Sequence, residues 1–377
     1  MTNVHDSDQQ DSSQQDAEDQ RWMQHALVLA KRGLYTTRPN PAVGCVIVKD
    51  GKLIGEGFHP KAGEPHAEVF ALRQADDEAV GATAYVTLEP CSHFGRTPPC
   101  AEGLIAAKVA RVVMAILDAN PQVAGQGLAK LQAAGIETRV GVCEAEARAM
   151  NVGFLQTMTG GRPFVRLKVA ASLDGRTAMS SGESKWITGS RARSDVQHFR
   201  AMSGAIITGI GTVLADDPLL NVRNLSDGTP IDLIPQPLRV VLDRHGKIPN
   251  TAQILNDVKT VLMVGVNAES TFSHLAADVE KWNYHSLAAL LDDLKNKKQI
   301  HDVLIEAGAT LSGAFIEAGL VDELIVYLAP TLLGSLARPM FNLPFLQMSE
   351  QVRWETVSMT QVGDNLRWIL KPVRSDE

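Results

Sequence analysis

His66, Glu68, Cys91 and Cys100 combine the residue types and the order of a catalytic zinc site. Zinc binds cysteine sulfur and histidine nitrogen, and its catalytic sites commonly use three protein ligands and leave one position to water. We therefore expect His66, Cys91 and Cys100 to bind Zn2+, and Glu68, which is not needed as a ligand, to move protons. Zinc lowers the pKa of bound water to about 7, which suits the hydrolytic deamination of a heterocycle. The alternative is a structural zinc site, which usually has four protein ligands.

The ends of predicted strands and helices should bring these four residues together. A helix expected over 65–79 carries the histidine and the glutamate in its first turn, where a proline is tolerated. A strand over 82–88 delivers Cys91, and Cys100 begins the next helix, whose positive dipole end favours thiolates. The alternation of strands and helices predicts a sheet between two layers of helices. Its other expected elements are a helix over 20–34, a type I′ hairpin of strands 43–49 and 52–58 turning at Asp50-Gly51, strands over 111–117 and 136–142, and helices over 127–134 and 144–158.

Eight residues separate the two cysteines, whereas the common deaminase signature has two. Within this insertion, Arg96 could contact a substrate phosphate and His93 a base edge; a purely structural loop is an equal alternative. Asn40, in a loop stiffened by two prolines, and His59, at a strand end, are possible pocket residues. For both, a structural role is the competing interpretation.

The 377 residues suggest two domains, and their charge is unevenly distributed. Residues 1–20 carry six acidic residues and no Lys or Arg, so the remaining chain is close to neutral and does not favour a nucleic-acid partner. We expect 1–19 to form a disordered acidic tail. No apolar run approaches the roughly 20 residues of a membrane helix, and no secretory signal precedes the four cysteines, which suggests a cytoplasmic protein with reduced thiols.

A second domain is expected after Gly160-Gly161-Arg162-Pro163, where glycines and proline interrupt the pattern. A strand over 303–305 is followed by a glycine-containing turn, 306–313, that opens a helix. Such a turn offers backbone N–H groups and a helix dipole to a phosphate; a tight turn without a ligand is an equal alternative. The Rossmann fingerprint is absent after the first strand of this domain.

The string from Cys91 to Cys100, together with Pro39–Gly44 and His66-Ala67-Glu68, closely resembles the bifunctional deaminase/reductase family of riboflavin biosynthesis. The resemblance implies two α/β domains: a cytidine-deaminase-like α/β/α sandwich over 20–160, and a dihydrofolate-reductase-like domain over 163–373 that binds NADPH. It implies hydrolysis of 2,5-diamino-6-(5-phosphoribosylamino)pyrimidin-4-one to 5-amino-6-(5-phosphoribosylamino)uracil and ammonia. Hydride transfer from NADPH would then convert the ribosyl group into a ribityl chain.

The resemblance extends over roughly residues 20–372 and assigns reductase residues position by position. Arg200 and Arg223 suit a phosphate, which a guanidinium binds bidentately, and Lys168 and Asp216 are candidate proton donors. Ala307 departs from the glycine that the family more often has there. The implied substrate-binding residues are Ser184, Arg200, Leu220, Arg223 and Glu306, and the implied NADPH-binding residues are Ala170, Trp186, Thr212, Asp216, Gly308, Ala309, Thr310, Leu311, Ser312 and Gly313.

The family also suggests a homodimer or higher homo-oligomer built on paired reductase domains.

Two alternative functions remain compatible with the sequence. One is a deaminase acting on nucleic-acid bases, which leaves over 200 C-terminal residues without a role. The other keeps the second domain as a nucleotide-binding module without catalytic activity.

Overall fold

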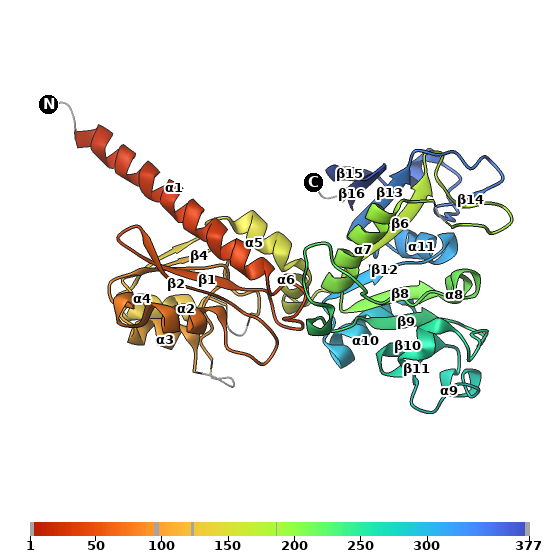
Figure 1. Cartoon of the computed structure of the whole chain (residues 1–377), viewed down its shortest axis with the longest axis horizontal. Coiled ribbons are helices and arrows are strands. Elements are labelled where there is room, and N and C mark those ends of the chain that lie inside the picture. Colours follow the sequence, from red (N-terminus) through yellow and green to blue (C-terminus); the bar gives the residue numbers. More distant parts are fainter. Residues whose placement is uncertain (1–3, 94–97, 122–123, 186, 374–377) are drawn as a thin grey trace. The chain divides into compact units, whose positions relative to one another are not determined.

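The computed structural model describes residues 4–93, 98–121, 124–185 and 187–373. The chain divides into two compact units, Met1–Gly161 and Arg162–Glu377, so the break lies within the glycine- and proline-containing stretch (Figure 1). Each unit contains its own sheet. Among the described residues, no helix combines the length and the apolar character needed to span a membrane.

The first unit is built on a five-stranded sheet with the order β2-β1-β3-β4-β5. Asp50 and Gly51 both have positive φ, 50° and 72°, which confirms the hairpin turn predicted between the first two strands. β1 pairs antiparallel with β2 and β3, whereas β3, β4 and β5 run parallel. The strands are β1 (Gly44–Lys49), β2 (Lys52–Phe58), β3 (Thr83–Val86), β4 (Arg111–Met114) and β5 (Glu137–Val140).

Helices cover both faces of this sheet, as the alternation of elements predicted. Alternate residues of β1 point to opposite faces, so that Cys45 and Ile47 pack with one group of helices, and Val46 and Val48 with the other. The first group is α2 (Ala67–Ala75), α3 (Cys100–Ala106) and α4 (Gln126–Ala133), and the second is α1 (Val4–Lys31), α5 (Glu144–Met150) and α6 (Val152–Met158). The single helix expected over 144–158 breaks at Asn151, whose side chain bonds both the N–H and the carbonyl of Ala42.

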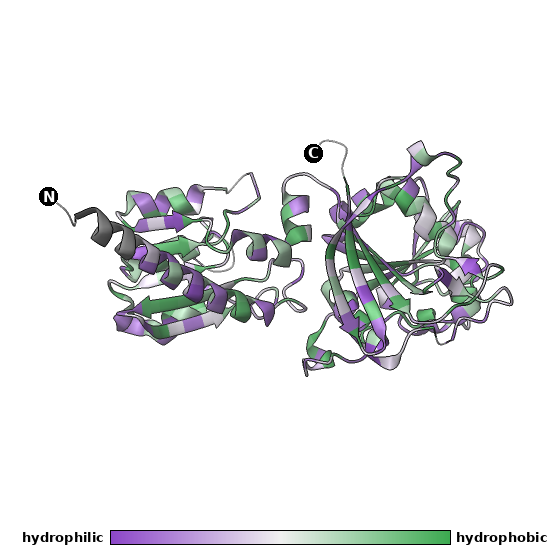
Figure 2. Ribbon diagram, turned by 90° about the horizontal axis from the view of Figure 1, so that it is seen from above, coloured by the Kyte–Doolittle hydropathy of each residue, from purple (hydrophilic) through white to green (hydrophobic). Residues whose placement is uncertain are grey.

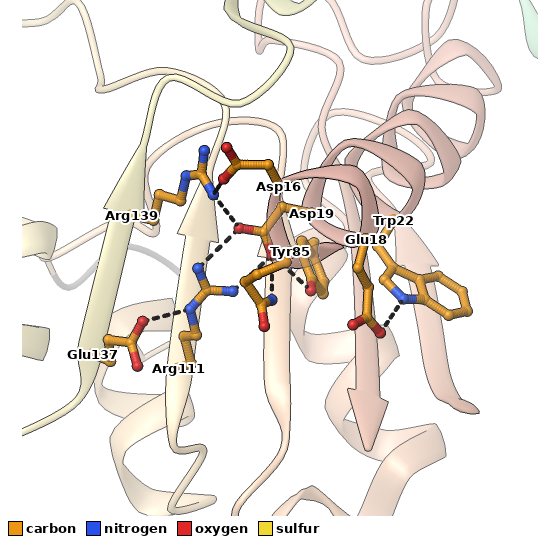
Figure 3. Close-up of polar contacts among 9 residues, drawn as sticks. Asp16, Glu18, Asp19, Trp22, Tyr85, Arg111, Glu137 and Arg139 are labelled. Atoms are coloured by element: carbon orange, nitrogen blue, oxygen red, sulfur yellow. Dashed lines mark hydrogen bonds and ion pairs between the residues drawn. The ribbon is translucent and has the colours of Figure 1, made fainter. Parts of the chain in front are cut away.

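The expectation of a disordered tail over 1–19 is wrong for 4–19, which lie in α1. Asp19 is fully buried and its carboxylate accepts two hydrogen bonds from Arg111, at 2.7 and 2.9 Å, and one from Arg139 at 2.8 Å. The Tyr85 hydroxyl donates a further hydrogen bond to Asp19, and Asp16 also accepts from Arg139 (Figure 3). These contacts attach the turn of α1 over 16–19 to the sheet, so its low hydrophobicity does not leave this turn unstructured.

The second unit is built on a nine-stranded sheet with the order β11-β10-β9-β8-β12-β6-β13-β16-β15. The strands run parallel from β11 to β13, and β16 and β15 add an antiparallel edge. The strands are β6 (Phe164–Ser172), β8 (Ala205–Gly209), β9 (Leu238–Leu242), β10 (Val261–Gly265), β11 (Glu280–Asn283), β12 (Asp302–Ile305), β13 (Glu323–Ala329), β15 (Trp354–Val362) and β16 (Asn365–Pro372).

Two apolar clusters fill the two faces of this second sheet. One contains α10 (Leu287–Lys298) and α11 (Ala309–Glu317), and the other contains α7 (Ser190–Met202) and part of α8 (Ile210–Asp216). Figure 2 shows hydrophobic residues concentrated along the strands of both units. A short pair, β7 (Arg176–Ala178) and β14 (Arg338–Pro339), lies outside the main sheet.

Candidate active site

The four predicted zinc-site residues lie at the ends of three elements of the first unit. His66 is the N-cap residue of α2, and Glu68 lies in the first turn of that helix. Cys91 follows β3, and Cys100 is the first residue of α3. Helix N-termini carry a partial positive charge, so α2 favours the carboxylate of Glu68 and α3 favours the thiolates of Cys91 and Cys100.

The distances among the ligand atoms match tetrahedral zinc. One nitrogen or sulfur atom from each of His66, Cys91 and Cys100 lies within 4.8 Å of the other two. His66 Nδ1 is 3.6 Å from Cys91 Sγ and 3.4 Å from Cys100 Sγ. Zinc bonds of about 2.3 Å to sulfur and about 2.0 Å to nitrogen at a tetrahedral angle place such atoms about 3.6 Å apart. The three side chains are therefore arranged to hold the metal.

Electrostatics within the trio also favour a cation. Hydrogen bonds from Cys100 and His66 lower the pKa of Cys91 to about 4, so that this side chain is a thiolate at neutral pH. The neighbouring Cys91 thiolate, together with burial, raises the pKa of Cys100. A second thiolate thus requires a positive charge between the sulfurs, which zinc supplies.

Glu68 is 3% exposed and hydrogen-bonds with Cys100. Burial raises the pKa of the Glu68 carboxyl, and the nearby His66 opposes that shift. A carboxyl with a raised pKa gives up and takes back a proton more readily near neutral pH. Its position and its pKa suit the predicted proton-shuttle role.

The structure brings His59 and Asn40 next to the zinc ligands. His59 is buried, and its Nδ1 lies 3.0 Å from the carbonyl of Pro65, the residue preceding His66. Asn40 Nδ2 lies 3.3 Å from the other ring nitrogen of His59. The His59 ring also meets the His66 ring edge-on at 5.5 Å. Burial lowers the pKa of His59, so a neutral ring that donates through Nδ1 fits these contacts.

The loop between the two cysteines is only partly described. His93 is exposed, whereas Arg96, the predicted phosphate contact, lies outside the described residues. Trp186, a predicted NADPH contact in the second unit, also lies outside them.

In the second unit, sheet register brings Lys168 and Glu306 together. β12 lies between β6 and β8, with Ile305 paired to both Leu167 and Ile207. Glu306 therefore follows its strand beside Lys168, and the closest approach of Lys168 Nζ to the Glu306 carboxylate is 4.0 Å. Burial lowers the pKa of Lys168, Glu306 opposes that shift, and Arg200 adds to it. Ligands of parallel sheets bind at these carboxyl ends of the strands.

The buried Arg200 is hydrogen-bonded to protein groups. Its Nε and Nη2 donate to the two Glu306 oxygens at 2.6 and 2.9 Å, and its Nη1 donates to the Asn221 carbonyl. Arg223 is exposed and donates to the Asn221 side chain. Partial burial and the nearby Arg200 lower the pKa of its guanidinium, and Glu306 opposes that shift. Three of the predicted substrate residues, Arg200, Arg223 and Glu306, therefore form one cluster, in which Arg223 is the more accessible guanidinium.

The remaining predicted substrate residues differ in how they face this cluster. Leu220 packs its side chain into an apolar core and has a φ of 48°, so only its backbone can meet a ligand there. The Ser184 hydroxyl donates to Asp216 at 3.1 Å, which connects a predicted substrate residue to a predicted cofactor residue. Ala170 lies near the end of β6 and is partly buried.

The 308–313 segment forms the N-terminus of α11, and its two halves have different surroundings. Gly308 is the N-cap residue, no side chain caps the helix, and the Gly308 N–H donates to the Thr212 hydroxyl at 3.2 Å. Gly308 and Thr310 are exposed, whereas Ser312 and Gly313 are buried. A Cβ on Gly313 would lie 2.1 Å from the Asn342 carbonyl, so packing explains that glycine. The first turn is the part that fits a phosphate of NADPH.

Two features of the first unit were not predicted from the sequence. Glu89 is buried and its carboxylate accepts four backbone N–H groups, from Asp118, Gly125, Gly127 and Leu128. Its position in the Glu-Pro-Cys string was the only available signal. The ion pairs of Asp19 were the other feature, and no local sequence motif indicates them.

Comparisons with known proteins agree with this two-part organisation. Residues 16–116 match the cytidine and deoxycytidylate deaminase zinc-binding region, and residues 163–367 match the RibD C-terminal domain. The riboflavin biosynthesis protein RibD of Escherichia coli (strain K12) is 51% identical over 368 residues, covering 93% of this chain and 98% of that protein. The chain belongs to the RibD family.

Solved structures extend the similarity to the whole fold. RibD from Acinetobacter baumannii superposes with a TM-score of 0.91 at 58% identity, covering 95% of this chain and 100% of that chain. A diaminohydroxyphosphoribosylaminopyrimidine deaminase/5-amino-6-(5-phosphoribosylamino)uracil reductase from Thermotoga maritima superposes with a TM-score of 0.87 at 33% identity, with the same coverage. As a RibD protein, the chain is a bifunctional zinc-dependent deaminase and NADPH-dependent reductase of riboflavin biosynthesis. The family assignment confirms the expected fold and excludes the base-deaminase and non-catalytic alternatives.

Proposed function

We propose that the first unit hydrolyses 2,5-diamino-6-(5-phosphoribosylamino)pyrimidin-4-one to 5-amino-6-(5-phosphoribosylamino)uracil and ammonia. His66, Cys91 and Cys100 would hold Zn2+, which supplies the Lewis acidity that makes water a nucleophile near neutral pH. The observation that carries the proposal is the 3.4–3.6 Å spacing of their ligand atoms beside the buried Glu68. The activity named for the Thermotoga maritima relative supports this substrate.

Glu68 moves the protons in this half of the reaction. It accepts one proton from the attacking water and delivers it to the ring nitrogen. It then accepts the second proton from the hydroxyl newly added to the ring carbon and transfers it to the amino group, which leaves as ammonia as the carbonyl forms. His59 and Asn40 position the start of α2, because the His59 ring bonds the carbonyl just before His66.

The second unit is proposed to reduce the deaminated product. Hydride transfer from NADPH to C1′ of the ribosyl group breaks the bond to the ring oxygen, which takes up a proton and leaves a ribityl chain. The α11 N-terminus with Thr212 and Ala170 would bind the cofactor, and Arg223 would bind the substrate phosphate. Lys168, with its lowered pKa beside Glu306, is the better-supported proton donor, and Asp216 positions Ser184.

A coupled assay on the full chain tests the proposal. Zinc-loaded enzyme should release ammonia from the diaminopyrimidinone and then oxidise NADPH. Glu68→Gln should lose ammonia release but still oxidise NADPH when the deaminated uracil is supplied. Ammonia release that survives this substitution would contradict the role of Glu68, and NADPH oxidation without any added pyrimidine would contradict the substrate.

We also propose that the chain forms a homodimer through its second unit and acts in the cytoplasm. Large apolar side chains are exposed there, with Leu346 at 91%, and the edge strand β15 lacks a partner on one side among the described residues. Free Cys45 and Cys143 and the thiolate ligands suit a reducing compartment. Light scattering should give twice the chain mass, and a monomer mass would contradict the dimer.

A further inference from the structure

The Glu89 carboxylate accepts hydrogen bonds from backbone N–H groups of two stretches that are distant from it in the sequence. Its Oε2 accepts hydrogen bonds from the N–H groups of Asp118, at 3.0 Å, and Gly125, at 2.9 Å. Its Oε1 accepts from those of Gly127, at 2.8 Å, and Leu128, at 3.1 Å. The side chain is 5% exposed, so these four donors satisfy a carboxylate that has almost no access to water.

The contacts of Glu89 fix the start of α4 directly against the residues that flank Cys91. A Cβ on Gly127 would lie 2.1 Å from the Pro90 carbonyl, so only glycine permits this approach. On the other side of Cys91, the Ser92 carbonyl accepts a hydrogen bond from Lys130 at 2.8 Å. Both neighbours of the cysteine therefore rest on α4.

We propose that Glu89 is a positioning residue for the metal ligand Cys91, acting through the N-terminus of α4. The carboxylate holds α4 in place, and α4 in turn holds the backbone on both sides of the Cys91 thiolate. Outer groups that fix metal ligands in this way typically change metal affinity or activity by about 10- to 100-fold when they are removed. The inference rests on the assignment of Cys91 as a zinc ligand.

The competing explanation is that Glu89 only caps α4. Gly125, the N-cap residue, has no side chain to do so, and a cap contributes to stability without affecting the metal. The two explanations differ in whether zinc and α4 influence each other.

Glu89→Gln in the full chain separates them. The amide offers one oxygen to two N–H groups and turns its own NH2 group toward the other two. We expect zinc release to a chelator to become about 10- to 100-fold faster and deaminase kcat/KM to fall by a similar factor, with reductase activity unchanged. Glu137→Gln, which removes an exposed carboxylate from the same unit, should change neither quantity. Hydrogen exchange over β1 and β2 should remain that of the wild type, which shows that the unit is folded.

A wild-type measurement tests the same coupling without any substitution. Because coupling between two sites is reciprocal, stripping zinc with a chelator should speed hydrogen exchange in the peptide covering 124–128. The inference would be overturned if hydrogen exchange over 124–128 were the same with and without zinc, or if Glu89→Gln released zinc at the wild-type rate. If Glu89→Gln also speeds exchange over β1 and β2, the substitution destabilises the whole unit, and the wild-type measurement alone then tests the inference. A wild-type chain that binds no zinc would overturn the ligand assignment and this inference together.

Discussion

Replacing Asp19 with asparagine should destabilise the deaminase unit although the residue lies in the acidic N-terminal segment. The side chain is fully buried and bonds Arg111, Arg139 and Tyr85 at once. Asparagine keeps the shape and one acceptor oxygen but removes the charge that both guanidinium groups face (Figure 3).

The expected cost is about 3 kcal/mol. Breaking a buried ion pair by removing one partner costs about 3–5 kcal/mol, because the other charge stays buried without compensation. The lower end applies here, since Arg111 retains Glu137 and Arg139 retains Asp16. Asp16→Asn is the matched control: it pairs with the same Arg139, but its side chain is 56% exposed, so its loss should cost at most about 1 kcal/mol.

Native-state hydrogen exchange in urea, read by mass spectrometry over β3, β4 and β5, measures this cost within the deaminase unit alone. Asp19→Asn should speed the exchange of the slowest amides about 100-fold, whereas Asp16→Asn should change it less than about tenfold. Equal effects of the two substitutions would refute the reasoning, because burial is what distinguishes the two carboxylates.

Three further results are expected. Cys91→Ser should lose the bound zinc and the ammonia-releasing activity while reductase turnover persists, as metal analysis and the two assays would show; retained zinc would contradict the ligand assignment. Arg223→Ala should raise the reductase KM for the phosphorylated pyrimidine about tenfold or more with little change in kcat; an equal KM increase for the unphosphorylated nucleoside would argue against a phosphate contact. Burial alone would raise the pKa of Asp19, but the hydrogen bonds from Arg111, Gln15 and Tyr85 and the charge of Arg111 together lower it in the folded state. The contribution of Asp19 to stability is therefore present above pH 3.8 and is lost as the pH falls through the lower folded pKa, so the exchange difference between wild type and Asp19→Asn should shrink below pH 3.8.

The zinc site could be predicted from the sequence because its information is local. His66 and Glu68 share one helix turn, and Cys91 and Cys100 flank one loop, so spacing alone places all four at neighbouring element ends. The Asp50-Gly51 turn was predictable for the same reason.

Contacts between distant segments could not be predicted in this way. The Arg200–Glu306 pair joins residues 106 positions apart, and Asp19 meets Arg111 and Arg139 across 92 and 120 positions. No periodicity or motif encodes such pairings, so Arg200 was expected to bind phosphate and the N-terminal segment was expected to be disordered. In both cases the fold supplies a buried partner that no local pattern indicates.

The most direct test of the account asks whether His66, Cys91 and Cys100 form a catalytic zinc centre. It measures the zinc content, the deamination and the reduction on one preparation of the full chain. One zinc per chain, ammonia released from the diaminopyrimidinone, and NADPH then consumed are the expected results. Removing zinc should abolish ammonia release and leave NADPH consumption intact when the deaminated uracil is supplied. Undiminished ammonia release from the zinc-free chain would contradict the role of the metal site.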